Sequence, residues 1–139
     1  MDKALNYLAL ARKGGLAELG EEPVGAISRT GKAYAILVAG DASDHTWRRA
    51  KSYAAGTDQQ CIRLSCTTEE MGFVVGRTSL AIAAITDVQL ALALVNSLGQ
   101  SERYSGALEV LSQKAQKAKK RQAEAKAHQR NLRKGGKKK

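Results

Sequence analysis

The stretch AYAILVA, residues 33–39, decides the fold class of this chain. It is apolar almost throughout and too short to form a helix of its own. A run of this kind is typical of a strand that is buried on both faces of a sheet. We therefore expect residues 33–39 to form the central strand of a sheet that helices cover on two sides.

Helical and extended patterns alternate on both sides of this strand. Apolar spacing, glycine stops and capping residues predict helices over residues 2–13, 20–31, 44–55, 68–75 and 88–98. Short apolar runs predict further strands over residues 16–19, 61–65 and 80–85. This order of elements implies an α/β protein with a three-layer α/β/α sandwich.

Three of the predicted helices carry candidate N-caps. Either Ser43 or Asp44 can cap the helix that follows the central strand. Thr67 and Glu70 have the spacing of a capping box, and Asp87 can cap the last helix of the body.

The positive charge is confined to the C-terminal part of the chain. Residues 1–99, the body, hold ten Lys/Arg and ten Asp/Glu, whereas residues 100–139, the tail, hold thirteen Lys/Arg and three Glu. The body is long enough for one hydrophobic core and one domain. We expect the tail to be a basic, partly helical or disordered extension, with a thin apolar stripe at Leu108, Leu111, Ala115 and Ala118 and with residues 134–139 disordered.

The sequence lacks the residues that catalysis or metal binding requires. The two histidines, His45 and His128, have no neighbouring partner for acid/base catalysis. We interpret Asp41, which follows the central strand, as a turn or cap residue. Cys61 and Cys66 lie without a nearby histidine, so we expect free thiols in a reducing cytoplasm. We expect no enzyme activity, no cofactor, no metal, no signal peptide and no membrane partner.

Two segments of the body carry a family resemblance. The first consists of GEEPVGA at residues 20–26 and GKA at 31–33, followed by the apolar strand and GDAS at 40–43. The second consists of EMG at 70–72 and VGR at 75–77, followed by AIAAI at 81–85 and TD at 86–87. These residues resemble the ribosomal protein 7Ae/30e family of kink-turn RNA-binding proteins, most of all its small bacterial 7Ae-like (YlxQ-type) members. The resemblance covers nearly all of Met1 to Leu98 and omits the tail.

The resemblance implies an α/β/α sandwich with a mixed four-stranded sheet that grips the bent backbone and flipped-out bases of a kink-turn. The implied contacts are the glycine-led start of the second helix and the loop before the last strand, because helix N-termini attract phosphates and irregular RNA offers unstacked bases. The positions carried over are Gly20, Glu21, Glu22, Pro23 and Ala26 in the first segment and Gly76, Arg77 and Thr78 in the loop. A basic rim beside them, or a set of solvated surface charges, consists of Arg12, Lys13, Arg29, Lys32 and Arg77.

The chain departs from the family pattern in the first segment. Where the family supplies an asparagine, a glutamate and a lysine, this sequence has Glu22, Pro23 and Ala26. Each of the three missing groups is worth about 1–3 kcal/mol, so we expect weaker binding to a standard kink-turn. An alternative is a protein-interaction module on the same fold whose acidic Glu21–Glu22 surface meets a protein partner; a third is the substrate-recognition domain of an RNA-modifying enzyme.

The tail offers a second route to RNA. Its cations can neutralise phosphates without reading sequence, and such binding weakens steeply with salt. The expected phosphate contacts are Lys114, Lys117, Lys119, Lys120 and Arg121. Stacking on single strands is not expected, since the aromatic residues are dispersed and most lie on faces expected in the core. The sequence thus predicts a cytoplasmic, monomeric, non-enzymatic protein that binds structured RNA and associates with the ribosome.

Overall fold

The computed structural model describes residues 3–99 and 102–137. Its helices are α1 (Lys3–Lys13), α2 (Glu21–Arg29), α3 (Asp44–Ala54), α4 (Thr68–Phe73), α5 (Val88–Ser97) and α6 (Ser105–Lys137). Its strands are β1 (Ala17–Leu19), β2 (Ala35–Val38), β3 (Gln60–Arg63) and β4 (Ile82–Ile85). The elements expected in the body are present, with shifted ends; the expected first residue of α1, Asp2, lies outside the described residues.

Within residues 3–99 the four strands form one mixed sheet in the order β1-β4-β2-β3. Strand β2 pairs antiparallel with β4 and parallel with β3, and β4 pairs antiparallel with β1. All four residues of β2 are buried, as the apolar run predicted. The sheet therefore has its two most apolar strands inside and confirms the predicted mixed α/β sandwich.

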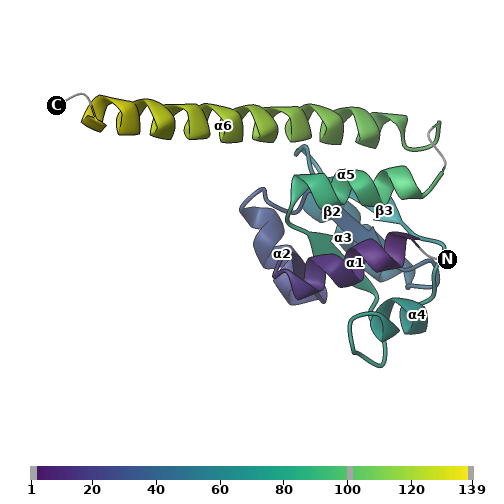
Figure 1. Ribbon diagram of the computed structural model, residues 1–139. Coiled ribbons are helices and arrows are strands. Elements are labelled where there is room, and N and C mark those ends of the chain that lie inside the picture. The colour runs from purple at the N-terminus through teal and green to yellow at the C-terminus, as the bar shows by residue number, and fades with distance from the viewer. Residues whose placement is uncertain (1–2, 100–101, 138–139) are drawn as a thin grey trace.

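Helices cover both faces of the sheet (Figure 1). Helices α1 and α5 pack against each other on one face, whereas α2 and α3 pack together on the other. Leu8 of α1 and Leu94 of α5 are buried against one side of the sheet, and Val24 of α2 is buried on the other. Removing these side chains from water is the main stabilising contribution to the body.

Local caps fix where three helices begin. Of the two candidates for α3, Ser43 is the cap, and its hydroxyl oxygen accepts a hydrogen bond from the Thr46 amide at 3.2 Å. Thr67 and Glu70 form the predicted capping box of α4, and Asp87 caps α5. Asp41 accepts a 2.7 Å hydrogen bond from the Thr68 amide, which ties the turn after β2 to the start of α4.

Helix α6 runs across the molecule on the side of α5 and extends beyond the body (Figure 1). Its apolar stripe faces α5: Leu111 and Ala115 are buried, with Leu108 and Ala118 half-buried. The side-chain amide of Gln89 on α5 also donates to the Ala115 carbonyl at 3.1 Å. The packed part of the chain thus continues past residue 99 to about Ala118.

The expectation of disorder from residue 134 is wrong for the residues that the structure describes, because α6 continues to Lys137. Residues 119–133 are rich in Ala, Gln, Lys and Arg, which are strong helix formers, and the helix runs on from them through the less favourable Gly135 and Gly136. Residues 138 and 139 lie outside the described part of the chain.

Candidate nucleic-acid interface

The start of α2 and the loop after α4 meet at one end of the sheet. Gly20 has a φ of 97°, a conformation that favours glycine, and its amide donates to the Ile82 carbonyl at 3.0 Å. The guanidinium nitrogen Nη1 of Arg77 lies 3.8 Å from the position that a Cβ on Gly20 would occupy. The two segments that the family resemblance singles out are therefore neighbours in space.

Helix α4 and the chain that returns over it hold this loop. The Arg77 amide donates to the Gly72 carbonyl at 2.9 Å, and the Leu80 amide donates to the Thr68 carbonyl at 2.9 Å. A Cβ on Gly72 would lie only 2.7 Å from the Cα of Ser79, so only glycine lets the return segment pass this close. The side chains of Arg77 and Thr78 are exposed on a loop with a fixed backbone path.

The two adjacent carboxylates of α2 have different surroundings. Glu21 is directed toward α3, where its Oε2 lies 3.6 Å from the Arg49 guanidinium and its Oε1 accepts a 3.4 Å hydrogen bond from Thr46. Glu22 is exposed in the first turn of α2, where the helix dipole favours negative charge. The Glu21–Arg49 pair lessens the repulsion that an approaching phosphate meets at this surface.

The predicted basic rim is divided between the two ends of α2. Gly20 and Arg77 lie where α2 begins, whereas Arg29 closes its last turn and Lys32 follows two residues after Thr30. Nine helical residues put the two ends of α2 about 13 Å apart. Ala26, Arg29 and Lys32 are exposed, but the structure does not bring Arg29 and Lys32 to the loop at residues 76–78.

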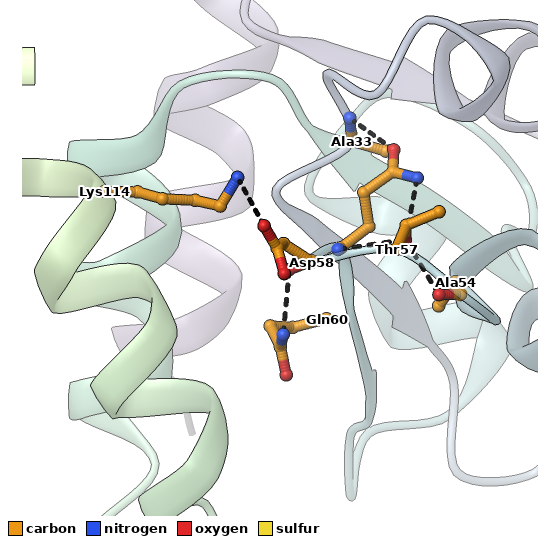
Figure 2. Close-up of polar contacts among 7 residues, drawn as sticks. Ala33, Ala54, Thr57, Asp58, Gln60 and Lys114 are labelled. Atoms are coloured by element: carbon orange, nitrogen blue, oxygen red, sulfur yellow. Dashed lines mark hydrogen bonds and ion pairs between the residues drawn. The ribbon is translucent and has the colours of Figure 1, made fainter.

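The C-terminal end of α2 lies near the part of α6 that packs on the body. The buried Gln59 side chain accepts a 3.0 Å hydrogen bond from the Ala33 amide and donates to the Ser28 carbonyl at 3.1 Å. The adjacent Asp58 carboxylate lies 3.6 Å from the Lys114 Nζ of α6 (Figure 2). This polar network joins α2, β2, β3 and α6 at one point.

The predicted phosphate contacts of the tail fall into two groups. The Lys114 ammonium pairs with Asp58 and lies 5.7 Å from the centroid of the Tyr34 ring. Lys117 and Arg121 line the same groove, of about 260 Å³, between α6 and Tyr34. Lys119 and Lys120 are exposed on other sides of α6. Lys114 thus anchors the tail to the body, and the other four cations remain accessible to a ligand.

Sequence reasoning missed Phe73 as a surface aromatic. Most aromatic residues were expected in the core, yet the Phe73 side chain is 83% exposed at the end of α4. Its carbonyl accepts a hydrogen bond from the Gly76 amide at 3.3 Å, so Phe73 flanks the loop at residues 76–78. Helix α4 is short and buries Met71 and Gly72, which places Phe73 on its outer face.

The cysteines and the acidic residues supply no further chemistry. Cys61 and Cys66 are free thiols, and burial raises the pKa of each to about 11. Over the described ranges 3–99 and 102–137, the structure contains no cluster of His, Cys, Asp and Glu that could hold a metal ion. Among these same residues, no helix combines the length and the hydropathy that a membrane-spanning segment requires.

Comparison with known proteins supports the fold and nothing finer. No family model matches the chain, and no curated protein matches its sequence. Among solved structures, the chain is similar to a protein of unknown function from Bacillus halodurans, with a TM-score of 0.64 and 19% identity over 69% of this chain and 96% of the other. At that identity the likeness shows a shared fold alone.

Proposed function

We propose that this protein is a non-enzymatic, 7Ae/30e-like protein that binds structured RNA, acting as a cytoplasmic monomer in association with the ribosome. The observation that carries the proposal is the meeting of the α2 start with the loop at residues 76–78, where Arg77 lies against Gly20. A sharply bent phosphate backbone can accept hydrogen bonds from the backbone amides at a glycine-led helix start. It can also bind the neighbouring guanidinium.

Phe73 offers an RNA contact of another kind than those that the altered α2 segment lacks. Glu22, Pro23 and Ala26 offer neither the amide nor the cation of the family pattern, and all three are exposed. The exposed phenyl ring of Phe73, whose carbonyl accepts from the Gly76 amide of the same loop, provides a stacking platform for an unpaired base, and stacking tolerates any base. We therefore propose an RNA site in which Arg77 contacts the backbone and Phe73 contacts an unstacked base.

The test compares the affinity of the full chain for a kink-turn RNA and for a straight duplex of the same length. Phe73→Ala is expected to weaken kink-turn binding by about 1–3 kcal/mol, or about 5- to 150-fold, and to leave duplex binding unchanged. Leu10→Ala is the matched control, because Leu10, 56% exposed on α1, is the other exposed large apolar residue among the side chains that the structure describes. Equal affinities for the two variants would show that this surface does not read RNA.

A gain-of-function variant tests the same surface in the opposite direction. The combination Glu22→Asn, Pro23→Glu and Ala26→Lys restores the family groups at exposed positions of α2. We expect it to bind a kink-turn RNA at least tenfold more tightly than the parent chain, because it adds a cation and a base-reading amide. No gain would place the RNA elsewhere.

The exposed carboxylate of Glu22 favours the second candidate function, a protein-interaction module on this fold. In that case a basic protein segment would occupy the start of α2. The same binding experiment separates the two functions: full-chain binding that shows no preference for the bent RNA and no dependence on Phe73 supports the protein partner.

A further inference from the structure

The candidate RNA surface and the turn of α6 that carries Lys114 lie at opposite ends of the sheet. Gly20 bonds to Ile82, the first residue of β4, and Ile82 pairs with Val38, the last residue of β2. Tyr34 and Asp58, which contact Lys114, precede the first residues of β2 and β3. Figure 1 shows the same arrangement, with α4 on one side of the body and α6 on the other.

Helix α6 is held in this position by its first turns. Leu111 is fully buried and Ala115 is 4% exposed, both against α5. The Gln89–Ala115 hydrogen bond fixes the same stretch. The Lys114–Asp58 ion pair, drawn in Figure 2, does so too. The cations at residues 119–126 therefore project from one side of the body rather than folding back toward Arg77.

The distal part of α6 is a cationic rod. The helix has 33 residues, which corresponds to a length of about 50 Å. Residues 119–129 of this rod carry Lys119, Lys120, Arg121 and Lys126 against Glu124, and all of these side chains are exposed. Residues 1–99 carry no net charge, so the excess positive charge of the protein belongs to the tail.

We propose that the two surfaces bind two RNA segments at the same time, so that the protein bridges RNAs. The bent segment occupies the surface of Gly20, Phe73 and Arg77, and a second, regular segment lies along distal α6, which contacts only phosphates. The inference rests on the proposed function for the first surface. Its new element is that the two sites act independently and hold two RNAs in one ternary complex.

The test is energy transfer between two separate RNAs in the presence of the full chain. A kink-turn RNA carries the donor, and a straight duplex that cannot pair with it carries the acceptor. We expect transfer to rise as protein is added, to peak near one protein per RNA pair, and to fall with excess protein, because separate chains then hold the two RNAs. No transfer under conditions where each RNA binds singly would overturn the proposal.

Matched charge variants identify the second site. Lys119→Glu with Lys120→Glu is expected to weaken duplex binding about tenfold and to abolish the peak, while kink-turn affinity stays within twofold. Lys3→Glu with Arg48→Glu makes the same change in net charge at exposed positions of the body and is expected to preserve the peak. An equal decrease in both variants would show that net charge, rather than α6, recruits the duplex.

The outcomes separate this inference from the proposed function. If the full chain binds the kink-turn RNA through Phe73 but gives no transfer, bridging is wrong and the proposed function stands. If Phe73→Ala and Leu10→Ala bind the kink-turn RNA equally, the first surface fails and bridging fails with it.

Discussion

Gly72 is the residue on which the shape of the candidate RNA loop depends most directly. Its carbonyl accepts from Arg77, and the backbone of Ser79 passes where a side chain would stand. The loop at residues 76–78 can return to β4 along this path only because residue 72 has a hydrogen atom where any other residue has a Cβ.

Replacing Gly72 with alanine is expected to destabilise the protein by about 1–3 kcal/mol, because the new Cβ would lie 2.7 Å from the Ser79 Cα and the backbone must move. Urea unfolding measures the change. Gly106→Ala is the control, since a Cβ there meets no atom within 4 Å and alanine favours the helix. A loss of stability no larger for Gly72→Ala than for Gly106→Ala would contradict the close packing.

Cys66 is expected to make the folded state sensitive to alkaline pH. Burial, followed by the Glu70 carboxylate, raises its pKa from 9.0 to about 11. Below about pH 9 the thiol is neutral in both states and its contribution to stability is fully present. Between pH 9 and 11 the unfolded thiol ionises while the folded one does not, so stability falls by at most about 2–3 kcal/mol.

The measurement is the unfolding temperature of the parent chain and of Cys66→Ala from pH 8 to 11. The variant is expected to be less stable at pH 8, because it leaves a small cavity, but to lose stability less steeply above pH 9. Parallel curves would show that Cys66 does not contribute to the alkaline loss.

Among the elements, α2 and α6 carry the functional argument for different reasons. The length of α2 separates Arg77 from Arg29 and Lys32, so these residues do not form the single basic rim that the sequence predicts. Helix α6 begins as part of the packed structure and ends as a charged rod. Its docking on α5 determines the direction in which the tail presents its cations.

Leu111→Ala tests the docking of α6. Because Leu111 is fully buried, the substitution is expected to lower the free energy of unfolding by about 2–5 kcal/mol. The exposed Glu109 provides the control, and Glu109→Ala is expected to change stability by no more than about 0.5 kcal/mol. Hydrogen exchange should show faster exchange of α6 amides in Leu111→Ala alone; equal exchange in both variants would mean that Leu111 does not hold α6 in place.

For the molecule as a whole, the separation of a neutral body from a basic tail predicts how RNA affinity responds to salt. A chain that ends at Ala118 keeps the buried Leu111 and Ala115 and lacks ten Lys/Arg of the full chain. The slope of log Kd against log salt should be shallower for the truncated chain than for the full chain. The difference should be about 0.7–0.9 for each phosphate that the removed cations neutralise in the full chain. The affinity of the truncated chain for bent RNA should be retained while its affinity for a straight duplex falls, so its preference for bent over straight RNA should rise.

Filter binding at several salt concentrations gives both slopes. Thermal unfolding is the control, and the truncated chain should unfold within a few degrees of the parent because its packed residues remain. An unchanged slope would show that distal α6 does not bind phosphates, and the disappearance of the preference for bent RNA would show that the body is not the reader.

Much of the architecture is encoded locally in the sequence. The apolar run at residues 33–39, the Thr67–Glu70 spacing and Asp87 each predicted an element that the structure contains, because burial on two faces and N-terminal capping depend on a few adjacent residues. The separation of a neutral body from a basic tail is likewise a property of the sequence alone.

The tertiary structure alone decided which of these residues act together. Helical spacing does not say what covers a position, so the sequence does not single out Phe73 among aromatic residues that mostly lie on faces expected in the core, whereas the structure leaves its side chain in solvent at the end of the short α4. Pairing of β4 with β1 and β2 brings Arg77 to Gly20, and packing of Leu111 on α5 carries α6 to the other end of the sheet, where Lys114 meets Asp58. These relations depend on long-range packing, which no window of adjacent residues contains.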